Sequence, residues 1–182
     1  MSNSLSDEAV LAAKVYEELH VPALFQQFAP IVVSTAQISP GQRVLDVACG
    51  TGILARTVVS TVTDAGPVTG LDQSPGMLAI ARQLTPSIDW LEGAAESLPF
   101  ADNSFDTVVS QFGLMFFQNR PSALREMVRV LAPGGRIVVA VWDALINSQA
   151  YPDEVDILQR LAGQAAADAL RAPFILGNSD HL

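Results

Sequence analysis

The sequence predicts an α/β protein built on a parallel sheet. Short apolar runs alternate with longer stretches whose apolar residues recur four positions apart, as on one face of a helix. Turn residues such as Pro40 and Gly41 separate the segments. Strands that alternate with helices in this way are typical of a parallel sheet. The chain has 182 residues, of which 49% are hydrophobic, and this is enough for one domain with a substantial core.

The first strand, loop and helix occupy residues 43–62. An apolar strand at 44–47 contains Asp46 near its end, and the glycine-containing loop 49–52 leads into the helix. Glycine lets the chain turn sharply and lets a ligand approach the backbone, while the helix start offers free N–H groups. An acid before such a loop would repel a diphosphate. The pattern therefore favours a cationic or amine-bearing ligand.

The second strand also ends in an acid. Residues 68–71 are expected to form the strand, Asp72 follows it, and Ser74 with Pro75 is typical of a helix start. Asp72 is thus expected at the carboxyl end of a strand, where open α/β sheets bind ligands. A carboxylate there can accept two hydrogen bonds from ribose hydroxyls. The alternative is a solvated turn aspartate.

Three more strands are expected, at 88–91, 105–110 and 136–142. The apolar cluster 114–117 follows the fourth strand and is either core or part of a substrate pocket. A helix from Pro121 is expected to stop at the tight turn 132–135, directly before the fifth strand.

Helical patterns flank these strands on both sides. Residues 1–39 should form helices interrupted at Pro22 and Pro30, which either cover the first loop or pack at one edge of the sheet. Tyr16 and His20 are the polar aromatic residues there that could contact a substrate. Residues 40–145 should form the core. Residues 146–182 should form a helical cap, with helices starting near Tyr151 and Gln164.

Composition argues against several classes of protein. A formal net charge of −9 and scattered basic residues argue against binding to nucleic acid or to an anionic membrane surface. The single cysteine excludes an intramolecular disulfide, and no Cys/His cluster has zinc spacing, so no metal site is expected. No apolar run approaches the roughly 20 residues of a membrane helix. A soluble, cytoplasmic protein is expected.

Three motifs together resemble a known family. D-x-A-x-G-x-G at 46–52, F-D-T-V at 105–108 and L-A-P-G-G at 131–135 resemble class I S-adenosylmethionine-dependent methyltransferases, in particular the quinone-biosynthesis C-methyltransferases of the methyltransferase type 11 group. The resemblance covers about residues 40–145. It implies a Rossmann-like doubly wound sheet of five parallel strands, in the order 3-2-1-4-5, with helices on both faces. The family's usual carboxyl-terminal antiparallel strand pair is absent, so either the chain is truncated or the fifth strand needs a partner, for example in a homodimer.

The resemblance also implies a cofactor, S-adenosyl-L-methionine, and a small-molecule methyl acceptor. Asp46 would face the amino-acid end of the cofactor and Asp72 the ribose. Ala48 replaces the family's first glycine, a small-for-small change, and Ala94 replaces the aspartate that reaches the adenine amino group. A water, Glu96 or a backbone carbonyl would take over that contact, with weaker affinity as one consequence. The implied cofactor-binding residues are Asp46, Ala48, Cys49, Gly50, Thr51, Gly52, Asp72, Gln73, Met77, Ala94, Ala95, Glu96, Ser110 and Gln111.

Methyl transfer from a sulfonium needs mainly positioning and exclusion of water. The sequence fits this reaction, since no Ser-His-Asp or Cys-His arrangement is visible in it and methyl transfer needs none. Cys49 is interpreted as a small buried filler. His20 is the candidate base if the acceptor is a phenol or enol. Two alternatives stay open: an NAD(P)-dependent oxidoreductase, although the third glycine of its fingerprint is missing, and a catalytically silent cofactor-binding or interaction module.

Overall fold

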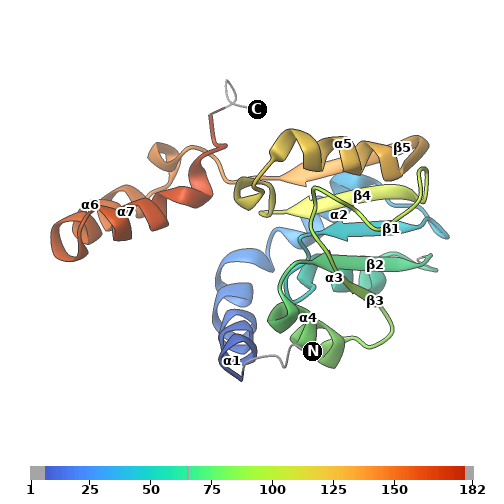
Figure 1. Cartoon of the computed structure of the whole chain (residues 1–182), viewed down its shortest axis with the longest axis horizontal. Coiled ribbons are helices and arrows are strands. Elements are labelled where there is room, and N and C mark those ends of the chain that lie inside the picture. The colour runs from blue at the N-terminus through green and yellow to red at the C-terminus, as the bar shows by residue number, and fades with distance from the viewer. Residues whose placement is uncertain (1–6, 65, 179–182) are drawn as a thin grey trace.

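Five parallel strands form the sheet in this computed structural model, which describes residues 7–64 and 66–178 (Figure 1). In chain order the strands are β1 (Val44–Val47), β2 (Val68–Asp72), β3 (Asp89–Glu92), β4 (Phe105–Gln111) and β5 (Leu131–Ala140). Neighbouring strands pair in parallel, and the spatial order is β3-β2-β1-β4-β5. The predicted order is confirmed.

Helices cover both faces of the sheet. On one face pack α2 (Ala29–Ala36), α3 (Ile53–Thr61) and α4 (Pro75–Leu84), and on the other α5 (Arg120–Val130). Side chains alternate across a strand, so in β1 Val44 joins the first core while Leu45 and Val47 join the second. Apolar positions on both faces explain why β1 is buried along its whole length.

The ends of β1 are as predicted, and those of β2, β3 and β4 differ from the predicted ones by at most one residue, whereas β5 differs more. This strand begins at Leu131, earlier than predicted, because Leu131 already pairs with β4, and the predicted turn 132–135 lies between the paired residues Leu131 and Arg136. Phe105 pairs with Leu131 and Thr107 with Arg136, so the residues between them bulge out of register. Pro133 cannot donate a ladder hydrogen bond, which accounts for the bulge.

The amino-terminal residues do not break at Pro22 as predicted. α1 (Asp7–Val15) continues directly into a π-helix, η1 (Tyr16–Phe25), which contains Pro22. Proline lacks an N–H and its ring crowds the carbonyl of residue i−4; the wider π-helical turn, with i→i+5 hydrogen bonds, moves that carbonyl out of line with the ring. Pro30 falls in the first turn of α2, where it is tolerated. We call residues 7–36 the N-terminal segment.

Beyond β5 the chain is helical. It forms η3 (Leu145–Asn147), α6 (Tyr151–Ala162), α7 (Gln164–Arg171) and η4 (Ala172–Phe174). The last of these, η4, packs against the short 3₁₀ helix η2 (Leu114–Phe116), which follows β4. Figure 1 shows α6 and α7 side by side, extending away from the sheet. We call residues 145–178 the C-terminal segment.

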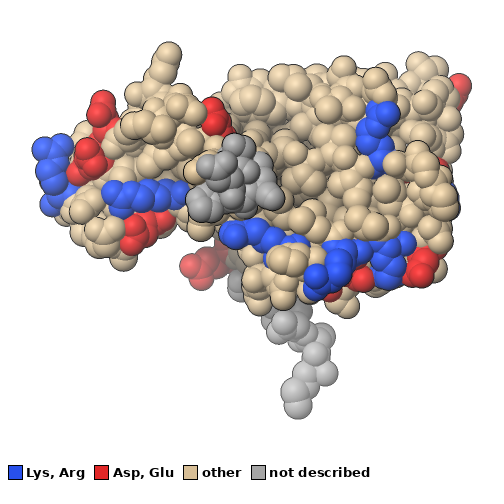
Figure 2. All heavy atoms as spheres, turned by 90° about the horizontal axis from the view of Figure 1, so that it is seen from above, with Lys and Arg blue, Asp and Glu red and all other residues tan. Residues whose placement is uncertain are grey.

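Some of the charged side chains form ion pairs, within one helix or between segments that are distant in the chain. On the face shown in Figure 2, Lys and Arg side chains are scattered, and some of them have Asp or Glu beside them. Arg129 pairs with Glu126 at 2.7 Å and with Asp102 at 2.9 Å, and Arg43 pairs with Asp106 at 2.7 Å. Within residues 7–64 and 66–178, no helix is long and apolar enough to cross a membrane.

Candidate functional site

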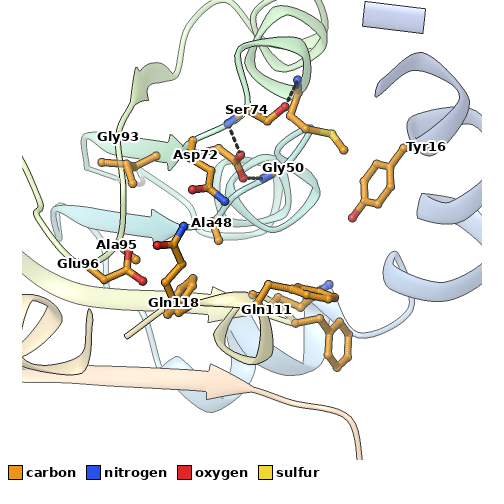
Figure 3. Close-up of a pocket in the computed structure, with 17 residues that line it drawn as sticks. Tyr16, Ala48, Gly50, Asp72, Ser74, Gly93, Ala95, Glu96, Gln111 and Gln118 are labelled. Carbon is orange, nitrogen blue, oxygen red and sulfur yellow. Dashed lines mark hydrogen bonds between the residues drawn. The ribbon is translucent and has the colours of Figure 1, made fainter. Parts of the chain in front are cut away.

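A cavity of about 310 Å³ opens at the carboxyl ends of β1, β2 and β4 (Figure 3). Open parallel sheets bind ligands at this edge, where connections to the two faces of the sheet diverge. Figure 3 shows Asp72 near the middle, Tyr16 on one side and Glu96 on the other. We call these two sides the Tyr16 end and the Glu96 end.

The Asp72 carboxylate is held by two backbone N–H groups. Gly50 N donates to Oδ2 at 2.8 Å and Ser74 N donates to Oδ1 at 2.8 Å, as the dashed lines in Figure 3 mark. Burial raises the pKa of Asp72, and the backbone hydrogen bonds oppose that rise. Each oxygen keeps a second lone pair. The carboxylate can therefore accept further hydrogen bonds from two hydroxyls of a ligand.

The loop after β1 turns through left-handed residues. Ala48, Gly50 and Gly52 have φ values of 59°, 56° and 90°. A Cβ on Gly52 would also overlap the ring of Trp90, so both backbone and packing require glycine there. Ala48 adopts the same region with a Cβ, at a cost of about 1–2 kcal/mol. The replacement of glycine by Ala48 is therefore less neutral than a small-for-small change implies.

Asp46 lies behind this loop. Its side chain is 1% exposed, and Ala55 N donates to Oδ2 at 3.1 Å. Burial raises the pKa of Asp46 to about 8, against the effect of that hydrogen bond. Asp46 lines a second, smaller cavity of about 20 Å³, next to the Tyr16 end. About 10–15 Å³ is enough for one water molecule, so this cavity has room for one small polar group.

Tyr16 brings the N-terminal segment to both cavities. Its ring stacks on Phe25 with centroids 5.3 Å apart. The neighbouring Glu17 forms an ion pair with Arg56 of α3 at 2.8 Å, and both side chains are 18% exposed. Burial, and then the charge of Asp72, raise the pKa of Tyr16. The hydroxyl therefore stays neutral and can donate or accept a hydrogen bond at this end.

Gln111, the last residue of β4, also lines both cavities. Its Nε2 donates to the Phe25 carbonyl at 3.1 Å. Its Oε1 is buried and has no hydrogen-bond partner among the described residues. A buried acceptor without a donor is costly, which marks this atom as a contact for a ligand.

Aromatic rings form the wall opposite Asp72. The cluster predicted as core or pocket is divided: Leu114 and Met115 are buried in the core, whereas Phe116 and Phe117 line the cavity. Phe112 lines it as well, with its ring stacked on Trp142 at a centroid distance of 4.0 Å. These rings give the cavity an apolar surface beside its polar one.

The predicted site residues fall into three groups. Eight line the main cavity, namely Ala48, Gly50, Asp72, Gln73, Met77, Ala95, Glu96 and Gln111. Two line only the smaller cavity, namely Asp46 and Cys49. Five line neither cavity, namely Thr51, Gly52, Ala94, Ser110 and His20. His20 is exposed, and its ring lies 5.7 Å from that of Tyr16.

Other lining residues were not among the predicted ones, namely Leu71, Ser74, Gly93, Gly113 and Gln118. Ser74 follows Asp72 by two residues and could have been found from that spacing. Gln118 lies in an irregular segment that only the fold brings to the Glu96 end (Figure 3). Within the described ranges, no group of His, Cys, Asp or Glu could hold a metal ion.

Comparison with known sequences identifies the family. A family model described as a methyltransferase domain matches residues 45–139, which is more than half of the chain. Demethylmenaquinone methyltransferase of Renibacterium salmoninarum is 50% identical over 111 residues, covering 60% of this chain and 45% of the relative. 2-Phytyl-1,4-naphtoquinone methyltransferase of Thermosynechococcus vestitus is 36% identical over 142 residues, covering 66% and 63%. The chain spans about half the length of curated relatives that it matches, such as two demethylmenaquinone methyltransferases.

Solved structures show the same fold. The [4+2]-cyclase SpnF is 34% identical with a TM-score of 0.57, covering 63% of this chain and 44% of that one. The YcgJ protein of Bacillus subtilis is 25% identical with a TM-score of 0.60, covering 73% and 58%. Sheet order and cavity define an α/β protein with a cavity at the carboxyl edge of its parallel sheet, where such sheets bind ligands. The chain belongs to the class I S-adenosylmethionine-dependent methyltransferase family, whose cofactor is S-adenosylmethionine.

The residues present fit that cofactor. A diol can meet the held carboxylate of Asp72, and an ammonium group can meet acceptors at the Tyr16 end. Gln111, whose buried Oε1 has no hydrogen-bond partner among the residues that the structure describes, lines the cavity at that same end. Acceptors without donors suit a cation better than a phosphate.

Proposed function

We propose that this chain forms the S-adenosylmethionine-binding part of a methyltransferase that acts on a small, apolar, ring-containing acceptor of the quinone type. The carrying observation is the Asp72 carboxylate, fixed by Gly50 N and Ser74 N inside a cavity that has cation acceptors at one end and an aromatic wall beside it. Two relatives named for naphthoquinone or menaquinone methylation support the acceptor class.

Each end of the cavity has its own task in this proposal. Asp72 holds the ribose hydroxyls, and Asp46 with Gln111 faces the ammonium group. The adenine ring lies at the Glu96 end of the cavity. Ala94 offers it no side-chain hydrogen bond and lines neither cavity. Glu96 accepts from Asn119 N at 3.1 Å, which fixes one of its oxygens and leaves the other for the base or a water.

S-adenosylmethionine, when bound, would supply a methyl group on a positively charged sulfur, and transfer of that group to the acceptor would leave the uncharged thioether of S-adenosylhomocysteine. The residues of this chain position the donor and the acceptor and exclude water from between them. Phe112, Phe116 and Phe117 offer flat apolar surface to a ring. The proton that the acceptor loses would go to water, to a group of the acceptor itself or to a base of this chain. His20, the candidate base, stays untested and lies on the exposed side of Tyr16.

One observation favours a second candidate. SpnF shares this fold and is named for cyclisation, so a chain of this family can host chemistry other than methyl transfer. A cofactor-binding module that transfers no methyl group is therefore the alternative. Cofactor binding would be the same in both cases, and only turnover separates them.

Binding is the first test. Isothermal titration of the 182-residue chain should give saturable binding of S-adenosylhomocysteine and none of NAD. Asp46→Ala and Asp72→Ala should each weaken that binding at least tenfold, with thermal unfolding still cooperative. Unchanged affinity in both variants would contradict the site.

Turnover is the second test. Radiolabelled S-adenosylmethionine and a panel of small acceptors, with short-chain naphthoquinols first, should give labelled product, ideally also with a longer form of the protein. Binding without labelled product from any acceptor would favour the silent module. A cytoplasmic location and a homodimer remain predictions, to be checked by fractionation and by light scattering.

A further inference from the structure

The indole ring of Trp90 fills space that two glycines leave open. Trp90 lies in β3 and is 8% exposed. A Cβ on Gly52, the N-cap of α3, would overlap Cη2 of the indole and lie 2.9 Å from Cζ3. A Cβ on Gly70, in β2, would overlap Cζ3 and Cε3 of the same ring. The six-membered part of the indole therefore packs directly against the backbone of both glycines.

The sheet register explains how one ring reaches both glycines. Gly70 pairs with Trp90 on one side and with Asp46 on the other, so the three residues form a row across β3, β2 and β1. Residues paired in this way share a face of the sheet. Because Gly70 has no side chain, the indole can extend over β2 towards the loop that follows β1.

The opposite edge of the indole is fixed to α4. Trp90 Nε1 donates to the carbonyl of Thr85, the C-cap of that helix, at 2.9 Å. Arg82, in the last turn of α4, donates from Nη2 to the Trp90 carbonyl at 2.9 Å. Trp90 lines neither cavity. Any effect of this residue on a ligand therefore acts through the residues against which it packs.

The loop 49–52 has few side-chain contacts of its own. Gly50 and Gly52 carry no side chain, and the buried Thr51 hydroxyl has no hydrogen-bond partner among the residues that the structure describes. Gly50 N nevertheless has to lie within hydrogen-bond distance of Asp72, where it donates to Oδ2 at 2.8 Å. The indole packed beneath the loop sets how close the loop can come to that carboxylate.

We infer that Trp90 is a positioning residue for the methyl donor, because its ring beneath loop 49–52 keeps the Gly50 N–H on the Asp72 carboxylate. The inference rests on the proposed function and deepens it, since Asp72 is the residue proposed to bind the ribose. Trp90 contacts no ligand in this role. The edge strand β3 takes part in donor binding through a side chain that reaches across β2.

A shorter side chain is the first test. Trp90→Leu leaves the space beneath Gly52 unfilled and should weaken S-adenosylhomocysteine binding about tenfold in isothermal titration. Trp90→Phe keeps a ring but loses Nε1, and it should weaken binding about threefold. Affinity within twofold of the wild type in Trp90→Leu would overturn the inference and make Trp90 an ordinary core residue.

Gly70 offers a second test. Gly70 has the extended backbone of a strand, which alanine also adopts. Gly70→Ala sets a methyl group against the indole and should weaken S-adenosylhomocysteine binding about tenfold, because the displaced ring pushes on the loop. In Gly70→Ala with Trp90→Leu, the methyl group enters the space that the indole left. Affinity of the double variant should then be no weaker than that of Trp90→Leu alone, and losses that multiply would contradict the inference.

The matched control is Val130→Ala, a fully buried residue in the core on the other face of the sheet. It should lower the melting temperature, as Trp90→Leu does, and leave S-adenosylhomocysteine affinity within twofold of the wild type. Exchange of the Gly50 amide hydrogen, followed by NMR in the ligand-free chain, should be about tenfold faster in Trp90→Leu and unchanged in Val130→Ala. Equal acceleration in both variants would show a loss of stability alone and overturn the inference.

The two kinds of measurement separate this inference from the proposed function. If the wild-type chain bound no S-adenosylhomocysteine, the proposed function would fall, whereas exchange of the Gly50 amide would still decide whether Trp90 holds the loop. Binding that is lost in Asp72→Ala and unchanged in Trp90→Leu would keep the proposed function and remove the inference.

Discussion

The N-terminal and C-terminal segments look alike in sequence and differ in what they contact. Both are helical with apolar stripes, and both flank the same sheet. The N-terminal segment contributes Tyr16 and Phe25 to the cavities, whereas neither cavity described here is lined by a residue of the C-terminal segment. In Figure 1, α6 and α7 lie against each other and extend from the sheet.

The anchors explain the difference. The N-terminal segment is joined to the core by Glu17–Arg56, by Gln111–Phe25 and by the close approach of α1 to Gly76 of α4. The C-terminal segment reaches the core through Phe174 and Gly177, near Trp142 and Asp143. An amphipathic helix therefore becomes part of a site only where specific contacts hold it there. A role of the C-terminal segment in acceptor choice stays a prediction.

The largest expected effect compares two acids. Asp72→Ala should weaken S-adenosylhomocysteine binding at least tenfold, because two held acceptors are lost from the cavity. Asp156→Ala, an exposed acid of α6, should change it less than twofold. Isothermal titration measures both. Similar losses in the two variants would contradict the comparison.

The second prediction concerns pH at the Tyr16 end. In the ligand-free chain, burial raises the pKa of Asp46 to about 8. An ammonium group beside Asp46 should lower that pKa, so that binding of the ligand releases a proton. Affinity for S-adenosylhomocysteine should therefore rise from pH 6 to pH 8 by about tenfold and level off above, and Asp46→Asn should flatten the profile. Titration in buffers of different ionisation enthalpy counts the protons.

The same shift affects stability with the opposite sense. The pKa of Asp46 in the folded chain is raised above its ordinary value. The contribution of Asp46 to the free energy of unfolding is therefore fully present below a pH of about 4 and is lost as the pH rises towards 8. The ligand-free wild type should thus unfold at lower temperature at pH 8 than at pH 5, and Asp46→Asn should lose part of that difference. A melting temperature that rises with pH in this window would count against the assignment.

The third prediction uses two glycines at close approaches. A Cβ at Gly76 would lie 2.6 Å from the Ala9 carbonyl oxygen, and one at Gly177 would overlap the backbone of Asp143 and Ala144. Gly76→Ala and Gly177→Ala should each lower the free energy of unfolding by about 1–3 kcal/mol. Only Gly76→Ala should weaken S-adenosylhomocysteine binding, about threefold, since only α1 carries η1. Urea titrations and calorimetry give both quantities.

The smallest expected effect compares two ion pairs. Arg56→Ala leaves the half-buried Glu17 without its cation and should destabilise the chain by about 1–2 kcal/mol, with binding weakened about twofold. Arg171→Ala removes an exposed pair with Asp168 and should cost less than about 0.5 kcal/mol without any change in binding. A larger effect at Arg171 would mean that the C-terminal segment matters more than its contacts show.

Local patterns predicted the core well, because they depend on neighbouring residues. The alternation in β1, the Ser74 cap and the Pro-Gly-Gly stop each act within a few positions, and the strand order was confirmed. Pro22 was misread because a π-helix has no pattern in its apolar spacing, and the wide turn that tolerates proline is decided by packing.

The sequence by itself determined which acids lie at the ends of the strands, because strand length and turn residues act locally, and the family resemblance added the order of the parallel sheet. Only the tertiary structure decided that Asp46 lines a smaller cavity of its own, that Gln111 lines both cavities, and that η1 rather than α6 contributes residues to them. Contacts between residues far apart in the chain carry no local signature, since they depend on how completed elements pack.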